Sequence, residues 1–266
     1  MHRPGLVGAG MLLGVITLAC LIGPLFTRAY DAIDRDAIAL GPSLAFPFGT
    51  DANGRDLLAR VLMGGRVSLG AGLLASTVAL VIGGLYGAVS GYAGERADAL
   101  MMRLVDILYA LPLFFLIILL IVVFGRRLVL VFVAIGAIEW LDMARIVRGQ
   151  TMALKQRDFV HAARALGVSP TGILRRHIAP NLAGGIVVTL TIIAPRIMLI
   201  ESALSFIGLG VQEPMTSWGA LIADGARQIQ SAPSTLLIPA AFLTATLLAF
   251  NVLGDALRDA LDPRDA

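Results

Sequence analysis

The chain has 266 residues, of which 58% are hydrophobic and only 15% are charged. Soluble domains carry about 25% charged residues, so this composition excludes an ordinary water-soluble protein. The net charge is +3, and all basic residues except Lys155 are arginine. No basic run is interleaved with aromatic residues, which argues against nucleic acid as a partner and favours a membrane protein.

Six apolar stretches approach the length of about 20 residues that a helix needs to cross a bilayer. They cover residues 5–26, 66–92, 99–124, 128–147, 182–205 and 236–256. Residues 99–124 form the clearest span, and residues 128–147 the weakest, because Glu139 and Asp142 lie within the latter. Since lipid cannot satisfy exposed backbone groups, the sequence predicts an all-α polytopic membrane protein with about six transmembrane helices.

The predicted spans divide the chain into two parts. Residues 1–65 would form an N-terminal transmembrane helix and a polar external loop, and residues 66–266 the main transmembrane domain, with a second external loop at 206–235. The first apolar stretch is longer than a typical signal sequence, so an uncleaved helix is expected. Its Cys20 is the only cysteine, so no intrachain disulfide can form. A buried thiol is expected there, with lipidation as the less favoured alternative.

Basic residues indicate the orientation. Seven of them lie in the segment from residue 145 to 176, against one clearly exposed acid, Asp158: Arg145, Arg148, Lys155, Arg157, Arg164, Arg175 and Arg176. This segment should face the cytoplasm. With six spans both termini face the same side, which agrees with Arg3 at one end and Arg258 and Arg264 at the other.

Catalytic and metal-binding motifs are absent from the sequence. A nucleotide-binding P-loop requires Gly-Lys-Ser/Thr, but the only lysine, Lys155, lies between Leu154 and Gln156. The three histidines form no His-Glu-x-x-His pattern, and no Gly-x-Ser-x-Gly elbow is present. We therefore expect no catalytic residue, no metal site and no bound cofactor in this chain. Any ATP hydrolysis would occur elsewhere.

The segment 158–181 predicts a cytoplasmic helix–turn–helix. In its first helix one face at i, i+3, i+4 and i+7 contains Phe159, Ala162, Ala163 and Leu166, whereas His161 lies off that face.

The devices that would end and begin these two helices lie in the turn. Gly167 suits the left-handed position just past a helix end. Ser169 is a typical N-cap, followed by Pro170 at the first helical position. A second short helix should end near Ile178, with Pro180 stopping it. For an arbitrary loop, a solvated segment on the bundle would be the default interpretation, and a docking element for a partner the alternative.

This segment resembles the "EAA…G…I-LP" loop of binding-protein-dependent ABC importer permeases, through His161-Ala162-Ala163, Gly167 and Ile178-Ala179-Pro180. The resemblance implies that its short helices insert into a groove on an ATPase subunit and transmit the closure of that subunit. His161 stands where the family usually has Glu, and Ala179 where Leu is common, so an ion pair of the usual carboxylate would be lost.

Further motifs resemble the C-type permeases of dipeptide and oligopeptide importers. They cover residues 48–56, 65–69, 204–212, 217–220 and 251–264. The resemblance implies an external "scoop" near the docking surface of a solute-binding protein, formed by Gly49, Thr50, Asp51, Gly54, Arg55 and Asp56. An ordered loop held by Asp–Arg hydrogen bonds is an equally weighted alternative.

Ionisable residues within the spans are costly and often functional. Asp106 is expected to pair with Arg103, and Glu139 and Asp142 to lie near Arg145. Arg196 and Glu201, next to Pro195, are the candidates for contacts with the pathway or a partner permease. Pro112 and Pro195 should kink their helices.

The resemblance implies a non-catalytic permease subunit in the bacterial inner membrane, with both termini cytoplasmic. It would pair with a second, homologous permease and with two ATPase subunits that bind ATP and Mg. An extracytoplasmic binding protein would deliver a peptide or similar small solute, a haem or nickel chelate included. The main alternative is a self-sufficient secondary transporter or channel. A membrane-anchored assembly protein is the third.

Overall fold

The computed structural model describes residues 4–125 and 127–261 and confirms the all-α fold: within these ranges there are helices, irregular connecting segments and one isolated bridge between Thr50 and Asp56, but no strand. The helices are α1 (Pro4–Ile22), α2 (Leu57–Ala93), α3 (Glu95–Tyr109), α4 (Leu113–Phe124), α5 (Leu128–Lys155), α6 (Asp158–Ala165), α7 (Pro170–Ile173), α8 (Ala179–Phe206), α9 (Trp218–Arg227) and α10 (Ser234–Leu261). A 3-10 turn (Gly23–Leu25) follows α1, and a π-helical turn (Leu174–Ile178) joins α7 to α8.

Four stretches of the described chain are long and apolar enough to cross a membrane alone: α1, α2, the continuous stretch Pro170–Phe206, and α10. A fifth span results if α3 and α4 count as one, but their axes meet at 81°. The segment 99–124, predicted as one span with a kink at Pro112, therefore contains two separate helices. Proline lacks an N–H and keeps the preceding residue out of helical conformation, so the predicted kink at Pro112 is a complete break.

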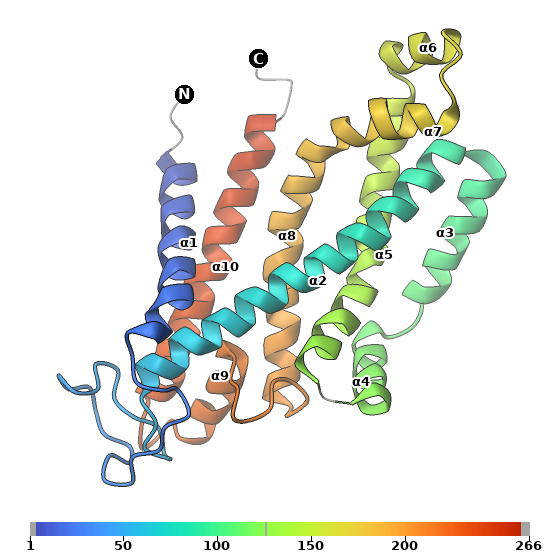
Figure 1. Ribbon diagram of the computed structural model, residues 1–266. Helices are drawn as coiled ribbons and strands as arrows, with labels where there is room; N and C mark the ends of the chain where they lie inside the picture. Colours follow the sequence, from blue (N-terminus) through green and yellow to red (C-terminus); the bar gives the residue numbers. More distant parts are fainter. Residues whose placement is uncertain (1–3, 126, 262–266) are drawn as a thin grey trace.

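The second span begins earlier than predicted, because α2 starts at Leu57 rather than near residue 66. Asp56 caps it, accepting a hydrogen bond from the amide of Leu58 at 2.9 Å. The predicted division after residue 65 thus falls inside a helix. At 37 residues α2 is about 55 Å long, and it runs obliquely across the other helices (Figure 1).

The helix pair with the most extensive contact is α2 with α5, and small residues permit their close packing. On α2, glycines recur every four residues, at 83, 87 and 91, and a Cβ on any of them would come under 3.0 Å from backbone atoms of α5. On α5, Gly136 lies in the same way against the carbonyl of Ala75, at 2.6 Å from where its Cβ would be. Such small-xxx-small spacing lets helix backbones pack closely in membranes.

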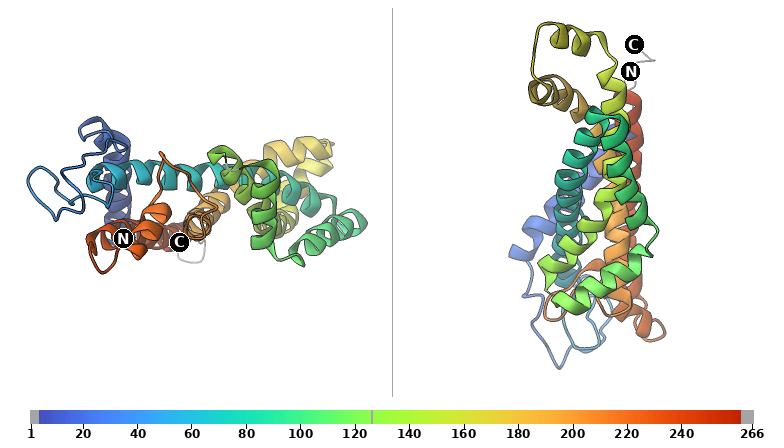
Figure 2. Two further views of the ribbon diagram at one scale, coloured as in Figure 1. Left: turned by 90° about the horizontal axis from the view of Figure 1, so that it is seen from below. Right: turned by 90° about the vertical axis from the view of Figure 1, so that its right-hand side faces the viewer.

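A second packed group contains α1, α2, α9 and α10, with Cys20 and Trp218 fully buried within it. Arg66 of α2 donates from Nε to the carbonyl of Cys20 at 2.8 Å and also reaches the carbonyl of Leu21. Its guanidinium therefore satisfies carbonyls at the end of α1. Two further views show the bundle as an elongated slab of helices (Figure 2).

The two ends of the bundle differ in content. The start of α1, the end of α10 and the segment α6–α7 lie at one end, and the irregular segment 26–56 and α9 lie at the other (Figure 1). Arg3 and Arg264, which contributed to the predicted orientation, lie outside the described residues. The start of α1 and the end of α10 lie at the same end of the bundle (Figure 1), as expected when a chain crosses the membrane an even number of times.

Candidate functional site

The α6–α7 segment is built on a well-defined turn. Gly167 has φ of 79°, and its amide donates to the carbonyl of Arg164 at 3.0 Å, while the amide of Val168 donates to that of Ala163 at 3.1 Å. These two bonds form the Schellman motif that ends a helix at a left-handed residue. Ser169 then caps α7, accepting from the amide of Gly172 at 3.3 Å, and Pro170 is its first residue.

The packing of α6 divides the predicted apolar face. Ala163 is buried together with Val160, a residue that the predicted face did not include, whereas Phe159, Ala162 and Leu166 are exposed. Leu166 has 84% of its surface accessible, and His161 is exposed as well. The inner face joins the main core, and the outer face presents apolar groups to whatever lies beyond the end of the bundle.

The expectation that Pro180 stops the second short helix is wrong. The π-helical turn Leu174–Ile178 carries α7 directly into α8, and Pro180 lies in the first turn of α8. A proline there removes one hydrogen bond and crowds the preceding turn, and a widened π turn accommodates such a distortion. The α6–α7 segment is therefore a continuous extension of a membrane helix.

Polar contacts that the sequence did not reveal clamp α5 to the α2–α3 turn near this segment. Arg148 donates to both carboxylate oxygens of Asp98 at 2.5 Å, and Ser90 donates to the same carboxylate at 2.5 Å. Lys155 donates from Nζ to the carbonyl of Tyr92 at 2.6 Å. Arg148 and Lys155 had been read only as markers of the cytoplasmic side.

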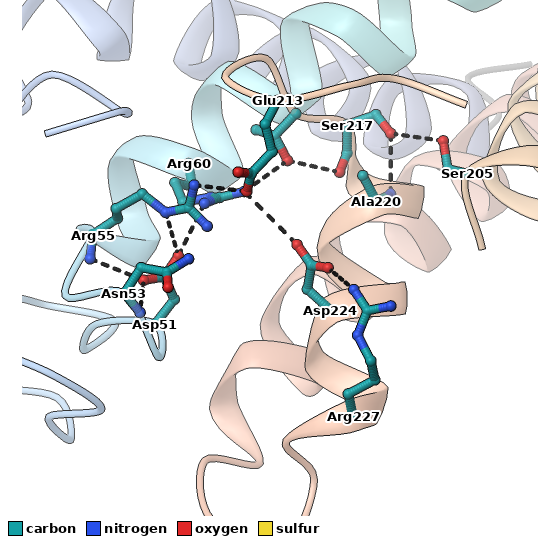
Figure 3. A network of polar contacts seen from close by, with 11 residues as sticks. Asp51, Asn53, Arg55, Arg60, Ser205, Glu213, Ser217, Ala220, Asp224 and Arg227 are labelled. Carbon is teal, nitrogen blue, oxygen red and sulfur yellow. Dashed lines mark hydrogen bonds and ion pairs between the residues drawn. The ribbon is translucent and has the colours of Figure 1, made fainter. Parts of the chain in front are cut away.

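At the other end of the bundle, Asp51 holds the loop before α2 (Figure 3). Its Oδ1 accepts from the amides of Asn53 and Arg55 at 2.8 and 2.9 Å, and its Oδ2 from Arg55 Nε at 2.7 Å and Arg60 Nη1 at 2.9 Å. Asp51 and Arg55 are buried, so both act through the shape of the loop rather than as an open contact surface.

The remaining predicted loop residues support the same turn. Thr50 donates to the carbonyl of Ala37 at 2.5 Å. Gly54 has φ of 77°, and a Cβ there would lie 2.8 Å from the carbonyl carbon of Asp34. Gly49 has φ of 83°, and a Cβ there would lie 3.2 Å from the carbonyl carbon of Gly41. Asp56 caps α2. The Asp–Arg hydrogen bonds of the ordered-loop alternative are therefore present.

Sequence reasoning missed the part of this network that lies beyond the loop. Arg55 Nη1 donates to Glu213 at 2.8 Å, and the buried guanidinium of Arg60 lies 3.9 Å from Asp224, which also pairs with Arg227 (Figure 3). Burial raises the pKa of Asp224 above its ordinary value, and Arg227 opposes that rise. The one available signal was Arg60 itself, a lone charge in an apolar run.

A pocket of about 420 Å³ opens beside this network. Its walls combine the charged groups Arg60, Asp224 and Arg227 with apolar residues that include Phe206 and Met215. Pockets that mix an apolar wall with a few charged groups are typical binding sites for small solutes.

The interpretation of Glu201 as a pathway or partner contact is wrong, because the residue is fully buried. Its Oε1 accepts from the Ser205 hydroxyl at 2.7 Å. Ser205 lies 3.4 Å from the hydroxyl of Ser217, which caps α9 by accepting from the amide of Ala220 at 3.1 Å. Glu201 therefore helps to fix α9 against α8.

Arg196, in contrast, is half exposed and bridges helices. Its Nε lies 3.6 Å from Glu139 Oε2, and its Nη1 pairs with Asp142, which also accepts from the Tyr109 hydroxyl. The expected pairing of Glu139 and Asp142 with Arg145 is wrong. Arg145 instead pairs with Asp106 at 2.8 Å, which also corrects the expected partner of Asp106.

Among the described residues, no group of three or more His, Cys, Asp or Glu side chains is arranged to hold a metal ion.

Comparison with known proteins gives a consistent result over the whole chain. Residues 80–265 match the family model of the binding-protein-dependent transport system inner membrane component. The chain is 50% identical to the oligopeptide transport system permease protein OppC of Escherichia coli (strain K12), over 100% of this chain and 89% of that protein. It is 47% identical to the OppC of Haemophilus influenzae, over 97% and 84%. It is 41% identical to the dipeptide transport system permease protein DppC of Bacillus subtilis (strain 168), over 99% and 82%.

Proposed function

Because the chain belongs to the family of binding-protein-dependent transport system inner membrane components, we propose that it is the membrane-embedded permease of an ATP-driven importer of dipeptides or oligopeptides. It would enclose the pathway together with a second, homologous permease. The peptide class comes from the names of the relatives, and the length of peptide accepted would depend on the binding protein and the second permease as well.

The observation that carries this proposal is the α6–α7 segment. Its inner face, with Val160 and Ala163, is packed into the core, and its outer face exposes Phe159 and Leu166. A turn with no partner would gain nothing from an exposed leucine at 84% accessibility, whereas an ATPase subunit with an apolar groove would bury it. Two ATPase subunits that bind ATP and Mg would dock there, and this chain would remain non-catalytic.

The orientation follows from that assignment. The α6–α7 end, with the start of α1 and the end of α10, would face the cytoplasm of a bacterium, and the chain would cross the inner membrane. The segment 26–56 and α9 would then face outward. The substrate-binding protein would dock at that end, over the network held by Asp51 and Arg55. Since those two residues are buried, they would fix the docking surface rather than form it.

A cysteine variant tests the role of the segment. Leu166→Cys carrying a bulky maleimide should lose co-purification with the ATPase subunits and lose ATP-dependent uptake of a tripeptide into proteoliposomes. The native Cys20 is fully buried and should not react. Leu44→Cys, at an equally open position of the segment 26–56, is the matched control, and its labelled form should retain the ATPase subunits.

Retention of the ATPase subunits by labelled Leu166→Cys would contradict the proposed docking. Peptide uptake by this chain alone, driven by an ion gradient, would favour a self-sufficient transporter instead.

A further inference from the structure

One face of α8 is exposed along its outer half, and it contains a charge. Ile192, Leu199 and Phe206 are 53%, 52% and 58% exposed, and Arg196 and Ala203 lie on the same face. These positions follow one another by three or four residues, so they form a single stripe of the helix. An arginine therefore interrupts an otherwise apolar surface.

The depth of Arg196 makes contact with lipid unfavourable. At 1.5 Å per residue, Arg196 lies about 15 Å along the axis from Phe206, the last residue of the span candidate Pro170–Phe206. Arg196 is thus near the middle of a hydrocarbon core of about 30 Å, and Glu139 lies at the same depth because its Oε2 is 3.6 Å from Arg196 Nε. A half-exposed ionisable group at this depth, such as Arg196, faces a water-filled cavity or another protein segment rather than lipid.

The groups linked to Arg196 carry an excess of negative charge. Three carboxylates (Asp106, Glu139 and Asp142) and two guanidinium groups (Arg145 and Arg196) are connected through the ion pairs and through Tyr109, over whose ring Arg145 lies at 4.2 Å. With the carboxylates ionised, the sum is one negative charge. Moreover, Glu139 is 3% exposed, and its Oε2 has no hydrogen-bond partner among the described residues.

We propose that this network is a binding site for the α-ammonium group of the transported peptide, on a pathway that follows the exposed face of α8. The proposal rests on the proposed function and names the group of the solute that is recognised. Every peptide with a free N-terminus carries this ammonium, whereas side chains differ. An importer of many different peptides therefore needs a site that recognises the N-terminal ammonium group and not the side chains.

The outer end of the same face leads to an entrance. The pocket of about 420 Å³ is lined by Ser205 and Phe206 at the end of α8, and Arg60 and Asp224 form its charged side. A peptide released at this end would meet the pocket first and the network about 15 Å deeper. The buried guanidinium of Arg60, whose Nε has no hydrogen-bond partner among the described residues, gives the pocket a cationic group.

The sign of the charge selects the ammonium over the carboxyl terminus. Arg196 already faces two carboxylates, so a third carboxylate would be repelled. An ammonium group, in contrast, would donate hydrogen bonds to the unused lone pairs of Glu139 and Asp142, and a charge-assisted hydrogen bond is stronger than a neutral one.

The first test measures whether water reaches the stripe. Leu199→Cys in the assembled complex should react with a membrane-impermeant methanethiosulfonate in at least one nucleotide state. Val15→Cys is the control, because Val15 is 63% exposed on α1, a helix without charged residues. The unmodified chain, with only the buried Cys20, should not react. If Leu199→Cys is as unreactive as Val15→Cys in every state, the stripe faces protein or lipid, and the pathway assignment is overturned.

The second test identifies the recognised end of the peptide. Two tripeptides with free termini are illuminated during uptake, one with photoleucine at its N-terminal residue and one with photoleucine at its C-terminal residue. In the wild-type complex the N-terminal probe should label α5 or α8 more strongly. Glu139→Gln and Asp142→Asn should reduce that labelling about tenfold, the loss that corresponds to one charge-assisted hydrogen bond. Asp255→Asn, on α10 outside the network, should leave it unchanged.

Equal labelling of α5 and α8 by both probes, or unchanged labelling in the Glu139 and Asp142 variants, would overturn the proposal. Uptake by the wild-type complex is measured in the same experiment, so a failure of this site is distinguished from a failure of the proposed import function.

Discussion

Replacing Gly87 by alanine should weaken the packing of α2 on α5, whereas the same replacement at Gly84 should not. A Cβ at position 87 would meet the carbonyl oxygen of Ala144 and would lie 2.9 Å from the amide nitrogen of Arg148. Both are backbone atoms and cannot rotate away. At position 84 the nearest atom is a terminal methyl of Leu80 at 3.4 Å, an ordinary contact.

The expected size of the effect follows from this geometry. Restoring an ordinary contact of about 3.5 Å requires the two helices to separate locally by roughly 1 Å, and such overpacking costs about 1–3 kcal/mol. Alanine also favours a helix over glycine by about 1 kcal/mol, but this gain is the same at both sites. The Gly87 variant should therefore be about 1–3 kcal/mol less stable than the Gly84 variant.

Thermal unfolding of the purified complex, with ATP-dependent uptake in proteoliposomes, measures the difference. Gly84→Ala should unfold at or above the wild-type temperature, and Gly87→Ala clearly below it with reduced uptake. Equal unfolding temperatures for the two variants would refute the claim that the glycine spacing sets the α2–α5 distance.

Three further outcomes are expected. Gly167→Val should reduce uptake, because a β-branched residue at φ of 79° costs about 1–2 kcal/mol, whereas Gly167→Asn should retain most activity; equal uptake by both variants would contradict this. Asp51→Asn should lower the unfolding temperature of the complex, since its carboxylate accepts the bonds of two arginines, with exposed Asp31→Asn as the neutral control. The raised pKa of Asp224 means that the folded chain binds the proton of this carboxyl group more tightly than the unfolded chain does. The protonated carboxyl group therefore stabilises the folded chain, and this stabilisation should be lost as the pH rises through the raised pKa. Asp224→Asn should remove that dependence from a melting-temperature profile.

The sequence predicted best those features that depend on a few neighbouring residues. Gly167, Ser169 and Pro170 define a turn and a cap by local backbone chemistry alone, and the structure has them in the predicted conformations. Apolar length likewise identified most of the spans. The break at Pro112 was only partly predictable, because a proline can either kink a membrane helix or end it, and the choice depends on surrounding packing.

Features that depend on distant partners were not predictable. Arg196 and Glu201 lie five residues apart on one helix, and nothing in the sequence indicates that one of them is exposed and the other buried. Their different burial arises from the neighbours of α8: α9 packs over Glu201, whereas the contacts of Arg196 with Glu139 and Asp142 leave its side chain 49% exposed. Arg60 gave a weaker signal still, since a lone arginine near a helix start reveals neither Asp51 nor Asp224 as its partner.

The contacts of α8 suggest how work at one end reaches the middle of the membrane. The α6–α7 segment continues into α8 through the π-helical turn, so a shift of that segment displaces α8 along or about its axis. By contrast, α5 is tied to α2 by the glycine packing at Gly87 and to the α2–α3 turn by the Arg148–Asp98 pair. Motion of α8 against this fixed pair must strain the contacts of Arg196 with Glu139 and Asp142. A peptide ammonium that competes for the same carboxylates would ease that motion, because it weakens the contacts that the motion has to break.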